Sequence, residues 1–308
     1  MHYSSTTIRF RPVLLLAFTL SFSFTKLAYA WGSLGHETVA WIAQSYVSPA
    51  TESTIKALLE SNRTDYMANV STWADSYRYT SEGRWTAPLH YIDANDDPPS
   101  SCSVDYARDC GDAGCSVSAI VNYTSILLNG HHRPSSSRNA SSAAVLKDAA
   151  RFIIHFIGDL HQPLHDEALD VGGNTINVTY DGEDTNLHHI WDTEIVEQLA
   201  DGMDAHEFAE NLTKSIEAGD YGWNVNGWLS GVVSVNNTLA TAMEWASEAN
   251  AFVCTDVLQE GVDAVEDDGD LSRSYYEAHY DVARVQIAKA GYRLGIWLNL
   301  IVTGRMDG

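Results

Sequence analysis

The sequence predicts a mainly α, multi-helix domain with one minor β-hairpin. Two observations carry this prediction. Apolar residues recur at three- and four-residue steps along most of the chain, which is the period of an amphipathic helix. The alternation typical of a half-buried strand is sparse; its clearest case is residues 174–180 (NTINVTY), directly before the turn pair Asp181-Gly182.

Helices are expected wherever the three- and four-residue period persists. The first covers residues 36–47 (HETVAWIAQSYV), and a second continues over residues 51–59. Residues 93–114 are rich in Asp, Pro, Ser, Cys and Gly, so they are expected to form a loop held by disulfides. The further predicted helices are 67–77, 118–128, 143–160, 187–199, 205–216, 239–258 and 274–301.

The first 30 residues have the pattern of a secretion signal. Two arginines precede an apolar run at residues 13–22, and Ala28-Tyr29-Ala30 fits the small-x-small cleavage rule. Cleavage after Ala30 would leave residues 31–308 as one catalytic domain that begins at Trp31. No later segment has enough uninterrupted apolar residues to span a membrane, so we expect a soluble, secreted protein without a membrane partner.

The chain is strongly acidic. Its formal net charge is −23; residues 1–30 contribute three cations and no acids, so the remainder carries −26. This charge argues against a protein that holds nucleic acid by a broad basic surface, because that affinity rests on Lys and Arg. A metal site can still be the phosphate-binding element, because bound metal ions are the largest local charges in a site.

Four cysteines in a secreted chain indicate two disulfides, with three possible pairings. Cys110 and Cys115 enclose a short loop that contains glycine, so they are expected to pair; Cys102 would then join Cys254. No CxxC motif is present, so zinc binding by cysteine is not expected. Seven Asn-x-Ser/Thr sequons are candidate glycosylation sites: Asn62, Asn69, Asn122, Asn139, Asn177, Asn211 and Asn236.

Residues 151–165 (RFIIHFIGDLHQPLH) are dense in metal-ligating side chains. His155 and Asp159 are four residues apart, so both project from the same face of a helix. Their neighbours are apolar, which predicts a buried helix. Pro163 is expected to end or bend this helix, and His165 follows two residues later.

A second pair with the same spacing, His188 and Asp192, lies in LHHIWD. Imidazole and carboxylate groups are ligands of zinc. One HxxxD pair alone is as compatible with a hydrogen-bonded pair inside a helix. Two copies with His165 between them favour a metal site.

Three further candidates are Asp75 in STWADSYR, His90 in APLHYID and His36 in WGSLGHE. Each alone has an ordinary interpretation: Asp75 as a surface carboxylate, His90 as a core histidine and His36 as a helix N-terminal residue. Their spacing in the sequence does not decide between these interpretations and a ligand role.

The chain resembles a known family at six segments: WGSLGHETVAWIAQ, STWADSYRY, LHYIDANDDPPSSC, HFIGDLHQPLHDE, GGNTINVTYDG and NLHHIWDT. These are similar to segments of the fungal and plant single-strand-specific zinc nucleases of the nuclease S-one and nuclease P-one type. The resemblance covers nearly all of residues 31–308, in the same order and with compatible spacing.

The resemblance implies a mainly helical enzyme with three zinc ions in a cleft. Trp31 would ligate through its amino nitrogen and carbonyl oxygen, so cleavage after Ala30 would be needed to free that amine. The implied ligand sets are Asp75, His90, His155 and Asp159; Trp31, His36 and the shared Asp159; and His165, His188 and Asp192. Neither His161 nor His189 matches a ligand of the family, and the polar pair His131-His132 is expected to be solvated.

The resemblance further implies hydrolysis of single-stranded DNA and RNA to 5′-phosphate products, with 3′-nucleotidase activity. Tyr91 would stack on a base and Asp93 would bind its edge, with Gly173 and Asn174 in the same pocket. The family commonly has Phe where this chain has Tyr91. Stacking demands an unstacked base, which favours single strands. Arg78 would neutralise charge in the transition state, beside the metal-bound carboxylates of Asp75 and Asp159.

Two alternatives remain at this point. Bacterial zinc-dependent phospholipases C share the three-zinc arrangement, the N-terminal tryptophan ligand and a related architecture. A non-catalytic secreted zinc-binding protein would retain zinc without turnover. The implied base pocket at Tyr91 and Asp93 favours the nuclease, which we expect to act as a monomer.

Overall fold

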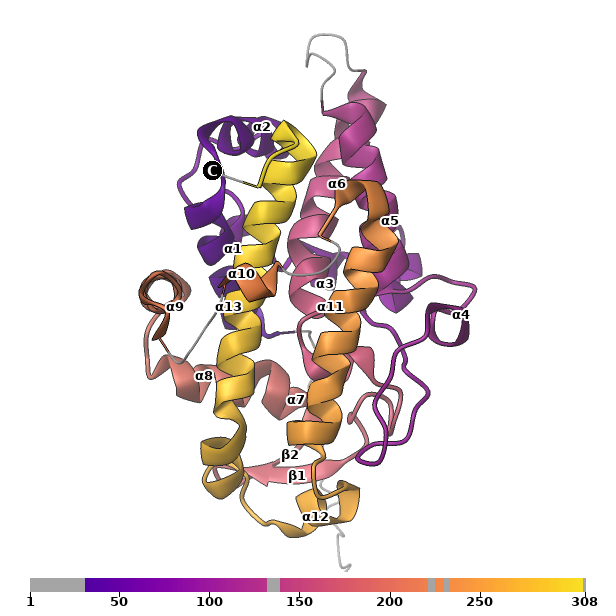
Figure 1. Ribbon diagram of the computed structural model, residues 1–308, viewed down its shortest axis with the longest axis vertical. Coiled ribbons are helices and arrows are strands. Elements are labelled where there is room, and N and C mark those ends of the chain that lie inside the picture. Colours follow the sequence, from indigo (N-terminus) through magenta and orange to yellow (C-terminus); the bar gives the residue numbers. More distant parts are fainter. Residues whose placement is uncertain (1–30, 132–138, 221–224, 230–232, 307–308) are drawn as a thin grey trace, which may run out of the picture.

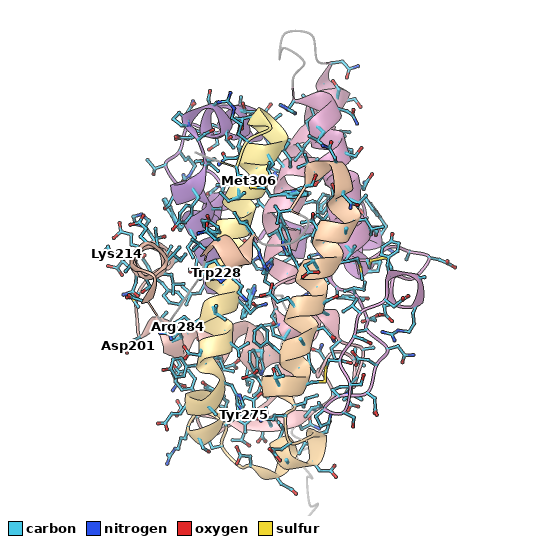
Figure 2. All side chains as sticks on the ribbon, viewed as in Figure 1. Asp201, Lys214, Trp228, Tyr275, Arg284 and Met306 are labelled. Carbon is cyan, nitrogen blue, oxygen red and sulfur yellow. A yellow bond between two sulfur atoms is a disulfide. The ribbon has the colours of Figure 1, made fainter. Side chains whose placement is uncertain are left out.

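Helix α13 (Ser274–Thr303) runs along the long axis of the molecule, and most of its side chains are buried (Figure 1). The computed structural model describes residues 31–131, 139–220, 225–229 and 233–306. The expected secretion signal therefore lies outside the described residues. Figure 2 shows how side chains fill the space between the helices.

Helix α13 packs along α1 (Ser33–Tyr46), α6 (Ala140–Asp159) and α8 (Ile195–Ala200). Gly291 permits the close approach of α13 to α1, because a Cβ atom there would lie 2.5 Å from Ile42 Cβ. The predicted mainly α architecture with a minor hairpin is confirmed. The remaining α-helices are α2 (Pro49–Leu59), α3 (Trp73–Tyr77), α4 (Tyr106–Asp109), α5 (Ser116–Gly130), α7 (Leu187–His189), α9 (Ala205–Ala218), α10 (Val225–Trp228), α11 (Thr238–Phe252) and α12 (Val262–Asp267).

Helix α6 begins where the Asn139 side chain accepts a hydrogen bond from the Ser142 amide. Its second half is buried on all sides, as its apolar sequence predicts. The helix ends at Asp159, and Pro163 begins a short 3₁₀-helix, η4 (Pro163–Asp166). Asp159 and His165 therefore lie on separate elements joined by one turn.

The segment expected as one helix over 67–77 is broken in two. A 3₁₀ turn, η1 (Ala68–Val70), precedes α3, and the backbone is not helical at Thr72. The break leaves the Ser71 carbonyl free to accept a 2.6 Å hydrogen bond from Nδ1 of the buried His155. Tertiary structure thus overrides local helical periodicity here.

The hairpin joins β1 (Asn177–Tyr180) to β2 (Glu183–Asn186) through Asp181-Gly182, which both have positive φ. The strand begins later than the expected residue 174. Residues 170–173 all have positive φ, a left-handed run that precedes the strand. This run forms part of the wall of the pocket described below.

Several boundaries differ from the expected ones. The 3₁₀-helix η2 (Arg84–His90) was not predicted, and the expected loop 93–114 contains α4. The helix expected over 239–258 ends at Phe252 and continues as a π-turn, η8 (Val253–Val257). A second π-turn, η5 (Ile190–Glu194), interrupts the helix expected over 187–199, and η7 (Val235–Asn237) is a further 3₁₀ turn.

Cys102 is bonded to Cys254 and Cys110 to Cys115. The expectation that His131 is solvated is wrong: it is buried, and its Nδ1 lies 2.7 Å from the Leu127 carbonyl at the end of α5. Its neighbour in the sequence, His132, lies outside the described residues. Within the part of the chain that the structure describes, no helix is both long and apolar enough to cross a membrane.

Candidate metal centre

Asp159, the last residue of α6, is the point at which three histidines meet. Its Oδ1 lies 3.2 Å from His36 Nε2, and its Oδ2 lies 3.0 Å from His90 Nδ1 and 3.3 Å from His155 Nε2. Asp75 Oδ1 lies 3.5 Å from His155 Nε2 and 3.8 Å from His90 Nδ1. All five residues are buried. Side chains from α1, α3, η2 and α6 thus converge on one cluster.

A second cluster contains His165, His188 and Asp192, which are also buried. His188 Nε2 lies 3.2 Å from Asp192 Oδ2, and the rings of His165 and His188 are 5.0 Å apart. The other oxygen of Asp192 accepts a 2.6 Å hydrogen bond from the Gln162 side chain. Gln162 therefore orients this carboxylate, a contact that its place in the sequence did not reveal.

Backbone carbonyl groups orient three of the histidines. Nδ1 of His155 donates to Ser71, Nδ1 of His165 to His90 and Nδ1 of His188 to Gly172, at 2.6, 2.7 and 2.6 Å. A carbonyl only accepts, so Nδ1 carries a proton and each Nε2 faces its cluster, where its lone pair becomes available to a cation once any proton on Nε2 is lost. Metal-ligating histidines are held in this way.

The buried atoms of the clusters suit cations. Several lack a hydrogen-bond partner: His36 Nε2, Asp75 Oδ1, Asp159 Oδ1, His165 Nε2 and Asp192 Oδ2. An unpaired buried polar atom is costly, and a bound ion removes that cost. Imidazole and carboxylate sets are the donors that zinc accepts. A further group in the described residues, Asp96, Cys102 and Glu167, is less suitable because Cys102 is in a disulfide.

In the first cluster, the charges of the histidines and the carboxylates stabilise one another. Burial opposes the charged form of His155, but the carboxylates of Asp159 and Asp75 raise its pKa to about 10. For Asp159, burial would raise the pKa, but His155 and the other histidines hold it well below its usual range. Metal binding would therefore displace a proton from this cluster, so metal affinity falls as the pH is lowered.

Trp31 is fully buried and lies two residues before the start of α1. The next amide, that of Gly32, donates a 2.6 Å hydrogen bond to the Asp192 carbonyl, which ties the start of the described chain to the second cluster. Gly32 O accepts in turn from the amide of His36, at 3.2 Å. The beginning of the chain thus adjoins residues of both clusters.

A cavity of about 390 Å³ opens beside the second cluster. Tyr91 and Asp93 line it, and both are exposed. Gly173 does not line it: its amide donates to the Leu169 carbonyl and its carbonyl accepts from the amide of His188, which does line the pocket. The other lining residues are Arg78, Tyr79, Ala87, Leu164, His165, Glu167, Val171, Gly172, Asn174 and His188.

Val171 is a pocket residue that the sequence did not reveal. It has φ +60° and is 69% exposed, an unusual combination for a β-branched residue. Its side chain stands in the wall that also contains Asn174. The two glycines that follow it indicate a turn, but no sequence signal identifies a valine held in a left-handed conformation.

Comparison with known proteins identifies the family. The family model described as S1/P1 Nuclease matches residues 31–303. The chain belongs to the S1/P1 nuclease family. Nuclease S1 of Aspergillus oryzae (strain ATCC 42149 / RIB 40) is 49% identical over 295 residues, which are 95% of this chain and 99% of that protein. Nuclease P1 of Penicillium citrinum is 48% identical over 274 residues, which are 88% of this chain and 97% of that protein.

A plant relative, Endonuclease 4 of Arabidopsis thaliana, is 34% identical over 292 residues, 90% of this chain and 91% of that protein. Membership of the S1/P1 nuclease family makes this chain a hydrolytic nuclease of a zinc-dependent family. S1/P1 nucleases share their fold with phospholipase C, in agreement with the mainly α architecture.

Proposed function

We propose that this S1/P1 nuclease is a secreted endonuclease that cleaves single-stranded DNA and RNA to 5′-phosphate products and has 3′-nucleotidase activity. The observation that carries the proposal is the placement of the two His/Asp clusters beside a pocket that Tyr91 and Asp93 line. The pocket shares His165 and His188 with the second cluster, and Arg78 of the pocket lies 4.0 Å from Asp75 of the first cluster. A base held in the pocket would therefore place its phosphate next to the clusters.

The clusters would hold three zinc ions. When bound, the zinc ions would activate water and neutralise charge on the phosphate. Asp159 would serve two ions, because its two oxygens face different histidines. The ligand sets would be Asp75, His90, His155 and Asp159; Trp31, His36 and Asp159; and His165, His188 and Asp192.

The pocket residues would bind and orient the substrate. Tyr91 is 37% exposed, so its ring is available to stack on an unpaired base. Asp93 would accept hydrogen bonds from the edge of that base, with Asn174 beside it and Gly173 supporting the wall. Arg78 lines the same pocket, with its guanidinium 4.0 Å from Asp75 Oδ1. It would neutralise charge that develops on the phosphate during cleavage.

Export would complete the enzyme. We infer that residues 1–30 are removed as a secretion signal and that residues 31–308 act as a single monomeric catalytic domain. The α-amino group of Trp31 would then be free to ligate. Each of the seven sequon asparagines is exposed, which suits a glycoprotein on the secretory route.

A side-by-side assay of denatured DNA, RNA and phosphatidylcholine tests this function. We expect nucleotide release from both nucleic acids, products with 5′-phosphates and no lipid hydrolysis. Lipid hydrolysis without nucleotide release would instead identify a phospholipase C-like enzyme. Zinc retention with no turnover would identify a non-catalytic zinc-binding protein.

A pocket variant makes the assay specific. Tyr91→Ala should raise KM for a single-stranded oligonucleotide by about 5- to 150-fold, because stacking is worth about 1–3 kcal/mol per base. Tyr106→Ala is the matched control, because Tyr106 has the same kind of exposed ring but lies outside the pocket lining. An equal effect of both variants would contradict the role of Tyr91.

A further inference from the structure

A buried group of charges joins α13 to α11. Arg293 and Lys289 lie one turn apart on α13 and are 4% and 8% exposed. Both bond to Glu248 of α11; Arg293 Nη2 is 2.5 Å from Glu248 Oε2, and Lys289 Nζ bonds to Oε1. Buried cations are costly unless they are paired. Glu248 therefore fixes the position of the Arg293 guanidinium.

The guanidinium makes two further contacts. Arg293 Nε donates to the carbonyl of Trp228 at 3.0 Å, and Figure 2 shows Trp228 close to α13. Arg293 Nη1 lies 2.9 Å from Nε2 of His161. His161 Nδ1 lies 2.7 Å from the Ile157 carbonyl, so Nδ1 carries the proton and Nε2 accepts from Arg293. His161 thus connects α13 to the last turn of α6.

His161 belongs to the turn that separates the two clusters. Its own carbonyl accepts a 3.0 Å hydrogen bond from Gln286, a third buried polar residue of α13. The backbone amide of the next residue, Gln162, donates to the Asp159 carbonyl at 2.9 Å. The side-chain amide of Gln162 donates to Asp192 Oδ1 at 2.6 Å. Helix α13 therefore holds the turn by two hydrogen bonds, one to the ring of His161 and one to its carbonyl. The turn in turn bonds to a candidate ligand of each cluster.

We propose that Arg293 and His161 are positioning residues that fix the turn at 160–162 and so set the placement of the two clusters relative to each other. The inference rests on the proposed function for its catalytic consequence. Neither side chain faces the pocket or belongs to a His/Asp cluster. Their effect would pass through Asp159 and through the Gln162–Asp192 contact.

A double-mutant cycle tests the pairing directly. His161→Leu and Arg293→Met each remove one partner of the same contact, so the double variant should lose little more than either single variant. Each single variant should lower kcat about 10- to 100-fold, the range typical of groups that orient metal ligands. KM for a single-stranded oligonucleotide should change less than about threefold, because neither side chain lines the pocket and the base-binding candidates Tyr91 and Asp93 are unchanged.

Zinc release provides a readout that does not depend on activity. The zinc-loaded variants, mixed with a chelator, should lose zinc faster than the wild-type protein. His161→Gln should restore slow release and most of kcat, because its side-chain oxygen can accept from Arg293. This conservative variant also keeps the test decisive if His161→Leu does not fold.

Arg284→Met is the matched control. Arg284 is a buried arginine of the same helix, 8% exposed and bonded to Asp281, and it lies nine residues before Arg293 in the sequence. This control should lower the thermal midpoint without changing zinc release or kcat. Equal effects of Arg284→Met and Arg293→Met, or unchanged zinc release in both partner variants, would overturn the proposal. A wild-type protein that does not cleave single strands would refute the proposed function, and the zinc-release comparison would still decide the positioning role.

Discussion

Asp159 faces more candidate ligands than any other carboxylate of the first cluster, because His36, His90 and His155 all lie within 3.3 Å of its oxygens. Asp75 approaches its nearest histidine at 3.5 Å. We therefore predict that Asp159→Asn lowers activity by more than about 100-fold and removes two zinc ions, beyond the range for groups that only orient ligands. Asp75→Asn should remove one zinc ion.

Metal analysis by mass spectrometry alongside kcat checks this prediction. Asp148→Asn is the control, because Asp148 lies on the same helix and pairs with Arg151 away from the clusters. Equal losses of zinc and activity at Asp75 and Asp159 would contradict the shared role of Asp159.

Gly158 limits the position of His36. A Cβ atom at Gly158 would lie 2.9 Å from His36 Nδ1, and the His36 ring is stacked on that of His155 at 4.0 Å. Gly158→Ala should therefore displace His36 and lower zinc content and activity about tenfold or more. Gly111→Ala, where no atom lies within 4 Å of an added Cβ, should have no effect. Unchanged zinc content in Gly158→Ala would show that His36 is not a ligand.

Residue spacing predicted only the ligands that lie four residues apart in the sequence, together with His165 between the two pairs. His155 with Asp159, and His188 with Asp192, are visible as pairs because a helix places residues four apart on one face. Asp75, His90 and His36 lie on other elements, so the family resemblance and not spacing assigned them. Gln162 and Val171 escaped both approaches, because hydrogen-bond partners and left-handed backbone conformations are set by tertiary structure.

At the scale of elements, the turn after α6 separates two kinds of ligand. Asp159 closes the helix and His165 lies in η4, which Pro163 begins. The buried charges of α11 and α13 stand behind this turn. Glu248 is the anion of that group, and although partial burial opposes its charged form, Arg293 and Lys289 lower its pKa to about 2.

This pKa shift predicts a pH dependence of stability. The folded-state value lies below the unfolded reference of about 4.3, so the carboxylate stabilises the fold fully above that reference. The contribution should disappear as the pH falls from about 4.5 to 2, where Glu248 takes up a proton. Glu248→Gln should therefore lower the thermal midpoint near neutral pH and have progressively less effect toward pH 2.

Thermal unfolding at several pH values measures the difference in thermal midpoint between the wild type and Glu248→Gln. A chelator is present so that zinc loss does not contribute. Glu210→Gln is the control, because Glu210 pairs with Lys214 on an exposed face of α9. A constant difference between wild type and Glu248→Gln from pH 7 to pH 2 would contradict the assigned interaction.

Periodicity predicted the long helices well and the short elements poorly. The helix expected at 274–301 is observed as Ser274–Thr303. The break at Ser71–Thr72 was not predicted, because the carbonyl it frees is needed by His155, far away in the sequence. Short 3₁₀ turns such as η2 carry too few residues to show a period.

At the scale of the whole molecule, residues 31–308 carry a charge of −26, yet the proposed substrate is itself an anion. The two are compatible because the positive charge that binds phosphate would lie inside the site and not on the surface. Among the described residues, the pocket has a single Arg or Lys side chain, that of Arg78. Bound zinc would supply most of the phosphate affinity. The amino-acid composition predicted the acidic charge. Its compatibility with a nuclease depends on the buried clusters that would bind the cations.

The N-terminus provides a prediction at the same scale. A chain that begins at Trp31 should bind three zinc ions, whereas one with Ala30 retained should bind fewer and lose most of its activity. The physical reason is that an amide nitrogen of the backbone lacks the lone pair that a free amine offers a metal. Native mass spectrometry of the two chains, with an oligonucleotide assay, checks it. Full activity with three zinc ions in the extended chain would rule out Trp31 as a ligand.

Anomalous scattering at the zinc edge, from crystals of the chain that begins at Trp31, would locate the metal ions themselves. We expect three peaks: one on each side of Asp159, and a third among His165, His188 and Asp192. A single peak, or peaks away from these clusters, would contradict a trinuclear centre built from these residues.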